Sequence, residues 1–383
     1  MQTTDVLIIG AGVVGLSIAY HLAESYPGLD ITVVEREKFP GMGATAHCTG
    51  GIRHQFSSRV NVEMTKISLP YFRRFNAEMG YPIYFRQYGY LFVTAKKERF
   101  GEFNKMVELL QSLDIPVSLY FAEDIGAKFP YLNVGDILGG TLCSLDGYAD
   151  PHGVTQGYFK QAVKRGVKIL TEEKVLSINA VKGRVAAVRT DTREIACGAV
   201  VNAAGPYLAE VAAMLGIGLP ARPYRRQVYV CGAVPEISPG IPLTVDMDTG
   251  LYLHAEKSGT LLAGGTDKDT APGYDQAVDK SLLDGFIEKA VHRIPAMIDA
   301  RLLRAYVGIR CLTPDYHAIL GETGAVRGFF CAGGFSGHGF MHAPATGLIM
   351  SQLIVDGRTN LVDLSPLSPD RFSTGYTAES NVF

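Results

Sequence analysis

The chain has 383 residues, hydrophobic side chains at 47% of its positions and a net charge of −2 at pH 7. These values predict a globular protein of one or two domains and exclude a disordered chain. The lack of a basic block argues against nucleic-acid binding, and no apolar run reaches the ~20 residues of a membrane span, so membrane association is not indicated. Glycine is in excess, with 43 residues, which predicts tight turns and close backbone approach to a ligand.

The cysteines and the first residues of the chain bear on its compartment. The six cysteines are scattered without a C-x-x-C pair, and the N-terminal residues carry no basic segment of the signal-peptide type. We therefore expect a cytoplasmic protein with reduced thiols. No four cysteines have the spacing of a zinc site, and no metal is predicted.

The first 35 residues predict a strand, a helix over 13–24 and a second strand over 31–35. An uninterrupted apolar run ends at Ile9, as is typical of a parallel sheet covered on both faces. Gly10, Gly12 and Gly15 follow as a G-x-G-x-x-G motif, and Glu35 ends the second strand. This arrangement predicts that the turn binds the pyrophosphate of a dinucleotide, while the carboxylate accepts hydrogen bonds from ribose hydroxyls and disfavours NADP. It does not separate NAD from FAD.

Strands and helices continue to alternate along the chain. Short strands with Gly and Pro turns over 224–265 predict an antiparallel sheet and a second domain. The other expected helices are 58–79 (kinked at Pro70), 96–113, 151–166, 282–294 and 344–355, and the other expected strands are 89–94, 167–178, 184–189, 199–203, 303–312 and 328–332.

Five further motifs, spread over the whole chain, resemble the D-amino-acid-oxidase-like flavoprotein family, which includes glycine oxidase, sarcosine oxidase and the proline dehydrogenase β subunit. They are a flavin-covering segment in two parts over 41–45 and 50–56, a second FAD signature over 200–207, a late FAD motif over 313–315 with 319–321, a C-terminal motif over 334–341, and the segment 146–151, which is similar to the proline dehydrogenase β branch. The resemblance implies FAD as the cofactor.

The resemblance also implies a fold class. We expect an α/β FAD-binding Rossmann-like domain, discontinuous over 1–86, 141–221 and 302–383. An α+β substrate domain with a mainly antiparallel sheet is expected over 87–140 and 222–301. The residues expected at the cofactor are Gly10, Gly12, Val14, Gly15, Glu35, Arg36, Ala44, Thr45, Gly51, Arg53, Val175, Ala203, Ala204, Gly205, Gly308, Gly334, Phe335, Ser336, Gly337, His338, Gly339, Phe340 and Met341.

Departures from the family pattern bear on how flavins are held. Gly308 stands where monomeric sarcosine oxidase has its flavin-linked cysteine, and Cys311 lies three residues away, so we expect non-covalent FAD. Pro151 stands where heterotetrameric sarcosine oxidases have the histidine that carries FMN, with His152 beside it. A second flavin, FMN, is expected only if the chain is a subunit of a hetero-oligomer.

By resemblance, Arg310 occupies the position of the carboxylate-binding arginine of glycine oxidase and D-amino-acid oxidase, although a salt bridge on the strand is the simpler alternative. A guanidinium can hold a carboxylate through two hydrogen bonds. Arg53 is the second candidate for this role, or else it positions the flavin. His338 is expected at the flavin edge, in a hydrogen-bonding or a catalytic role. Tyr252 is predicted to line the substrate cavity, as are Tyr224 and Tyr306.

These residues together predict FAD-dependent oxidation of a small amino acid, with hydride transfer to flavin N5 and an imine product. Three alternatives stay open: the catalytic β subunit of a hetero-oligomer that passes electrons to a partner subunit, a 2-hydroxy-acid oxidoreductase with His338 or His54 as base, and a non-catalytic FAD-binding assembly protein. Partner subunits or a homo-oligomer are both compatible with the sequence.

Overall fold

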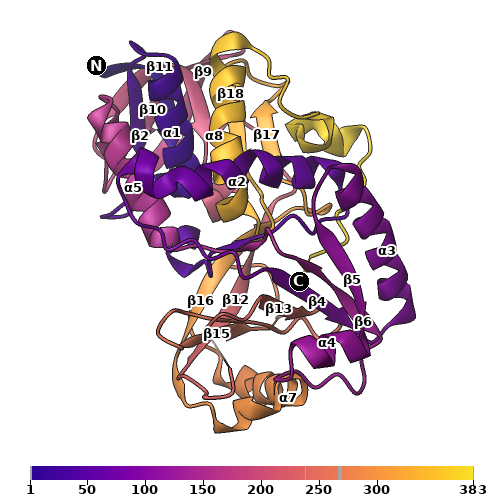
Figure 1. The fold of residues 1–383 in the computed structure, drawn as a ribbon. Helices are drawn as coiled ribbons and strands as arrows, with labels where there is room; N and C mark the ends of the chain where they lie inside the picture. Colours follow the sequence, from indigo (N-terminus) through magenta and orange to yellow (C-terminus); the bar gives the residue numbers. More distant parts are fainter. Residues whose placement is uncertain (1, 238, 266–269, 383) are drawn as a thin grey trace.

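The computed structural model describes residues 2–237, 239–265 and 270–382. It contains two eight-stranded sheets and a two-stranded sheet, with helices packed on the larger sheets (Figure 1). Within the described residues, none of the helices is long and apolar enough to cross a membrane.

The first sheet joins strands from the start, the middle and the end of the chain. Its path runs β17-β18-β11-β1-β2-β8, and every pair from β18 to β8 is parallel. The antiparallel strands β10 and β9 extend it from β11. The bounds are β1 Gln2–Ile9, β2 Ile31–Val34, β8 Lys168–Leu170, β9 Val175–Val181, β10 Arg184–Thr190, β11 Glu194–Asn202, β17 Ile319–Glu322 and β18 Phe329–Gly333.

Four long helices pack together over this sheet: α1 (Val13–Ser25), α2 (Arg59–Met79), α5 (Pro151–Lys164) and α8 (Gly339–Asp356). Helices α1 and α8 lie against each other, and the Ser17 hydroxyl donates to the Ala343 carbonyl at 2.8 Å. Leu16 and Ile349 are fully buried in this layer. Because α1 starts at the glycine turn and α8 at the C-terminal glycine motif, this packing brings two distant cofactor motifs to the same end of the sheet.

The second sheet has the path β16-β12-β15-β14-β13-β4-β6-β5 and is antiparallel except for the β13–β4 pair. The bounds are β4 Tyr90–Thr94, β5 Val117–Phe121, β6 Gly139–Cys143, β12 Arg222–Cys231, β13 Leu243–Asp246, β14 Tyr252–Ala255, β15 Leu261–Gly264 and β16 Leu302–Leu312. The accompanying helices are α3 Lys97–Ser112, α4 Ala122–Lys128 and α7 Leu283–Arg293.

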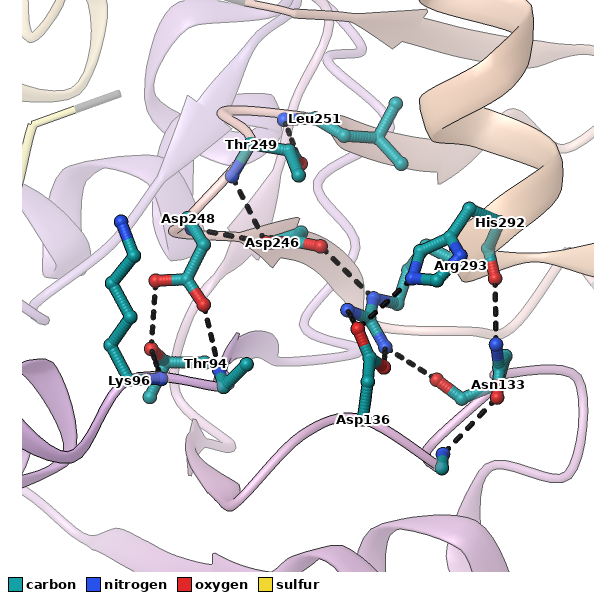
Figure 2. Close-up of polar contacts among 12 residues, drawn as sticks. Thr94, Lys96, Asn133, Asp136, Asp246, Asp248, Thr249, Leu251, His292 and Arg293 are labelled. Carbon is teal, nitrogen blue, oxygen red and sulfur yellow. Dashed lines mark hydrogen bonds and ion pairs between the residues drawn. The ribbon is translucent and has the colours of Figure 1, made fainter.

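A buried arginine ties α7 to the second sheet (Figure 2). The Arg293 side chain is 3% exposed; its Nε donates to Asp246 at 3.0 Å, and its terminal nitrogens donate to Asp136 at 2.7 and 3.1 Å. The other Asp246 oxygen accepts from the backbone N–H groups of Asp248 and Thr249. Every carboxylate in this cluster therefore has a donor, which is the condition for keeping such charges out of water.

The structure differs from the sequence-based elements in several places. The last helix begins at Gly339 rather than at 344, with Pro344 inside it. The expected strand over 167–178 is two strands, β8 and β9, which lie on opposite sides of the sheet and are separated by a turn at Glu172 with φ 58°. Periodicity did not predict β5, α4, β6, α6 (Leu208–Ala213) or the two-stranded sheet of β3 (Gly51–Ile52) and β7 (Gly147–Tyr148).

Strand membership also departs from the predicted domain boundaries. Strand β6 begins at Gly139, so the boundary at 141 falls inside it, and β6 belongs to the second sheet. Strand β16 also belongs to the second sheet, although 302–383 was assigned to the FAD-binding domain. Hydrogen bonding between β16 and β12 decides this placement, and no local pattern in either strand reports it.

Candidate active site

An elongated pocket lies where the ends of the first sheet meet the second sheet. It is lined by the turn after β1, the end of β2, residues 43–53, the end of β11, the second half of β16 and residues 332–341. The residues predicted at the cofactor line this pocket, with the exception of Gly15, and so do Arg310 and Tyr252. Among the described residues, Tyr224 and Tyr306 are not part of the lining.

The turn between β1 and α1 requires glycine. Gly10 has φ +106°, and a Cβ atom there would lie 2.5 Å from the Ala203 carbonyl oxygen. Gly15 does not face the pocket, and a Cβ atom there would lie 2.0 Å from the Gly10 oxygen, so it lets α1 approach the turn. Helix α1 begins at Val13 without an acidic residue in its first turn, which leaves its positive dipole end available to an anion.

Glu35 stands directly after β2 and lines the same end of the pocket. One of its oxygens accepts from the Ala11 backbone N–H at 2.8 Å and the other from Glu37 at 2.9 Å. Burial raises the pKa of this carboxyl, and the two backbone hydrogen bonds act against that rise. Two accepted hydrogen bonds leave lone pairs for the ribose hydroxyls of a dinucleotide. Arg36 lies beside it, with its guanidinium 4.4 Å from the centre of the Tyr207 ring.

The other end of the pocket is formed by the loop between β18 and α8. Gly334, Ser336 and Gly337 all have positive φ, at 65°, 52° and 99°. The loop is tied down because Ser336 donates its N–H to the Cys311 carbonyl at 2.9 Å. The N–H groups in the first turn of α8 have no partner within the helix, and that turn holds no acidic side chain. The pocket therefore ends on a donor-rich, electropositive helix terminus, although α8 starts five residues earlier than expected.

Arg310 projects from β16 toward this helix terminus. A Cβ atom on Gly337 would lie 3.3 Å from the Arg310 guanidinium, which locates that group against the loop. Arg310 is half-buried, and its charge contributes to lowering the pKa of His338. Arginine, loop and helix terminus thus form one electropositive corner of the pocket.

Arg53 is 1% exposed and lies in the same corner. One terminal nitrogen donates to the Gln55 carbonyl, and the other donates to the Asn381 carbonyl at 2.7 Å and lies 3.5 Å from Nε2 of His338. Its guanidinium lies 3.8 Å from the centre of the Phe56 ring. Backbone carbonyls therefore already engage both terminal nitrogens of Arg53, which fixes its position.

His338 is the residue before α8 and is 4% exposed. Burial, and then the charge of Arg53, hold its pKa well below the usual value, so the ring is neutral at pH 7. His54 occupies a different place: its Nδ1 lies 2.7 Å from Asp146, both side chains are buried, and it is not in the pocket lining. Of the two histidines considered as bases, His338 is the one at the pocket. His54, Cys143 and Asp146 each bring a potential metal-ligand atom within 4.8 Å of the others, and none of the three lines the pocket.

The sequence did not single out several residues that line the pocket: His47, Cys48, Tyr90, Arg226 and Val382. Cys48 lies between the two motifs read as the flavin-covering segment, so closer reading of that segment could have found it. Burial raises the pKa of its thiol, which keeps it protonated. Arg226 and Tyr90 are ordinary strand residues by pattern, and nothing local marks Val382.

A glycine turn with a nearby buried carboxylate at one end of a pocket, and an electropositive corner between the two sheets at the other, is the arrangement expected of a dinucleotide-dependent oxidoreductase. The family model described as FAD dependent oxidoreductase matches residues 5–353, and the chain belongs to this family. The predicted family and the enzyme class are confirmed, and so is FAD dependence.

Solved structures and curated proteins agree with this assignment. The crystal structure of L-proline dehydrogenase from P. horikoshii superposes with a TM-score of 0.91, at 30% identity, over 98% of this chain and 99% of that one. FAD-dependent oxidoreductase domain-containing protein 1 of Xenopus laevis is 29% identical, over 97% of this chain and 83% of its own. Mitochondrial dimethylglycine dehydrogenase of Rattus norvegicus is 28% identical over 98% of this chain, which spans only 45% of that protein.

Proposed function

We propose that this chain oxidises a small amino acid with a primary or secondary amine, such as proline, sarcosine, glycine or a D-amino acid, by hydride transfer to non-covalently bound FAD. The observation that carries the proposal is the electropositive corner of Arg310, Arg53 and the α8 terminus at one end of the pocket, with the glycine turn and Glu35 at the other. The similarity to L-proline dehydrogenase and dimethylglycine dehydrogenase supports an amino-acid substrate.

The pocket residues fit FAD. The Gly10 turn leaves no room for a side chain, the first turn of α1 offers backbone donors to a pyrophosphate, and Glu35 offers acceptors to a ribose. The donor-rich terminus of α8 suits the N1 and C2 carbonyl side of a flavin, where reduction places negative charge. We assign the FAD to the first sheet and its helices, and the substrate wall to the second sheet, which supplies Arg310, Tyr252 and Tyr90.

Bound FAD would supply the hydride acceptor. Arg310 would hold the substrate carboxylate through two charge-assisted hydrogen bonds and so fix the Cα–H relative to the cofactor. Arg53 contributes positive charge to the same corner but stays on its two carbonyl partners. Neutral His338 offers a nitrogen that accepts a hydrogen bond, as the removal of a proton from a substrate ammonium requires.

The neutral ring of His338 at the pocket also favours a second candidate function, the oxidation of a 2-hydroxy acid. A 2-hydroxy acid would need a base for its hydroxyl proton, and His338 can serve as that base. The choice between oxygen and a partner subunit as electron acceptor is separate from the identity of the substrate.

Anaerobic reduction tests the proposal. The purified yellow protein is mixed without oxygen with glycine, sarcosine, proline, D-alanine and, as the alternative, lactate, and the absorbance of the flavin is followed. Bleaching by at least one amino acid is expected. Bleaching by lactate alone favours the hydroxy-acid function, and no bleaching by any amino acid refutes the proposal. Co-purification and native mass then distinguish a lone enzyme from a subunit.

A further inference from the structure

In the segment Glu379 to Val382, which reaches the pocket, two of the side chains are buried although Ser380 is exposed. Glu379 is 1% exposed, Asn381 is 1% exposed, and Val382 lines the pocket. Neither the motifs nor the proposed function accounts for this placement.

Glu379 anchors the segment to the start of α2. Its two oxygens accept hydrogen bonds from the N–H and hydroxyl of Ser57, the N–H and hydroxyl of Ser58, and the amide of Asn61. Asn381 adds its own N–H. Burial raises the pKa of this carboxyl, but the hydrogen bonds from the serines outweigh it and hold the pKa below the usual value. The carboxylate is therefore ionised at pH 7 and saturated with donors.

The anchored segment places two groups at the electropositive corner of the pocket. The Asn381 carbonyl accepts from Arg53 at 2.7 Å, and its side chain donates to the sulfur of Met106 at 2.9 Å. Val382 follows Asn381 directly in the chain and lines the pocket, as Arg53 does, which places it close to the Arg53 guanidinium. An apolar, partly exposed valine beside a buried arginine presents a wall to whatever the arginines hold.

We propose that residues 379–382 form a further wall at the substrate end of the pocket, beside the one that the second sheet supplies, with Val382 setting the size of the carboxylic acid accepted and Glu379 acting as a positioning residue through Asn381 and Arg53. This proposal rests on the proposed function, because it takes that corner as the substrate site. It predicts that volume at position 382 discriminates between substrates by size and leaves FAD binding unchanged.

The test measures binding of two non-oxidisable acids, acetate and the larger pyrrole-2-carboxylate, by titrating the flavin absorbance of the holoenzyme. Val382→Phe should weaken pyrrole-2-carboxylate at least 10-fold and acetate less than 3-fold, at full FAD content. In Val382→Ala the affinity for acetate should stay within 3-fold of the wild type, and the affinity for the larger acid should not fall. Val355→Phe is the matched control, because Val355 is 41% exposed and lies near the end of α8 remote from the pocket. If the Val382 variants changed the affinity for both acids equally, or for neither acid, the proposed wall would be refuted.

Two further measurements separate this proposal from the proposed function. Iodide quenching of flavin fluorescence needs no substrate: it should rise about twofold in Val382→Ala and fall in Val382→Phe, and unchanged quenching overturns the wall even if no acid binds. Glu379→Gln should weaken both acids and speed hydrogen exchange over 376–382, with Glu379→Asp intermediate. Faster exchange without any change in acid affinity would show that Glu379 is structural only. Failure of every amino acid to bleach the flavin would refute the proposed function while leaving the quenching result intact.

Discussion

Replacing Arg310 by methionine removes the guanidinium from the substrate corner and keeps a side chain of similar reach. We expect kcat/KM for the best amino acid to fall, because a carboxylate would lose two charge-assisted hydrogen bonds. At a net value of about 1.5–3 kcal/mol for each hydrogen bond to a charged group, the loss of one bond corresponds to a fall of roughly 10- to 150-fold, which is the least that we expect when both are lost. Arg53 cannot fully replace it, since both of its terminal nitrogens already donate to backbone carbonyls.

The same substitution should alter the pH profile. The charge of Arg310 contributes to lowering the pKa of His338, so its removal should raise that pKa. If His338 accepts the substrate proton, the acidic limb of the kcat/KM profile should shift to higher pH. Arg310→Lys keeps the positive charge but lacks the forked guanidinium donors. Its kcat/KM profile should therefore keep the acidic limb of the wild type, while its affinity for the substrate should fall.

Stopped-flow reduction of the flavin without oxygen gives the rate and the apparent affinity for each variant. Arg304→Met is the matched control, because Arg304 lies on the same strand and is exposed. An Arg310→Met enzyme whose kcat/KM stays within twofold of the wild type, with full FAD content, would refute the role of Arg310.

Three more predictions concern the cofactor turn, the second sheet and pH. Gly10→Ala should yield protein without the 450 nm absorbance of flavin. Gly28→Ala is the control and should stay yellow, because Gly28 has φ +104° but a Cβ atom there would meet no other atom within 4 Å. A yellow Gly10→Ala protein would contradict the turn assignment. Arg293→Met should lower the free energy of unfolding by about 3–5 kcal/mol in urea, since it leaves Asp246 buried without its cation, while Arg74→Met at an exposed pair should cost under about 1 kcal/mol; equal losses would argue against the buried network. Burial lowers the pKa of His21 and His254 to about 4, so the unfolded chain binds protons before the folded chain as the pH falls below 6.5. Each of these two histidines should therefore lower the free energy of unfolding by about 2 kcal/mol at pH 5. Equal unfolding free energies at pH 7 and pH 5 would contradict this.

The cofactor end of the pocket was largely predictable from the sequence, because its signals are local. Gly10, Gly12 and Gly15 lie within six residues, between an apolar strand and a helix, and Glu35 ends the next strand. Such spacing specifies the turn without knowledge of any other part of the chain. Missed elements such as β6 and α6 are short, so periodicity had too few residues to report them.

The substrate corner depended on contacts that no local pattern carries. The sequence named Arg310, Arg53 and His338 by resemblance, but only the fold shows Arg53 held by Asn381, 328 residues away, and lying 3.5 Å from His338, 285 residues away. The same holds for β16, which hydrogen bonding to β12 places in the second sheet.

Sequence alone predicted the glycine turn and the carboxylate expected at a dinucleotide, because backbone conformation and helix polarity act over a few residues. Tertiary structure decided which side chains meet at the electropositive corner and that Val382 lines the same pocket. The physical reason is that packing and buried hydrogen bonds join residues that are close in space, as where Glu379 accepts from Ser57 and Ser58, which lie 322 and 321 residues earlier in the chain.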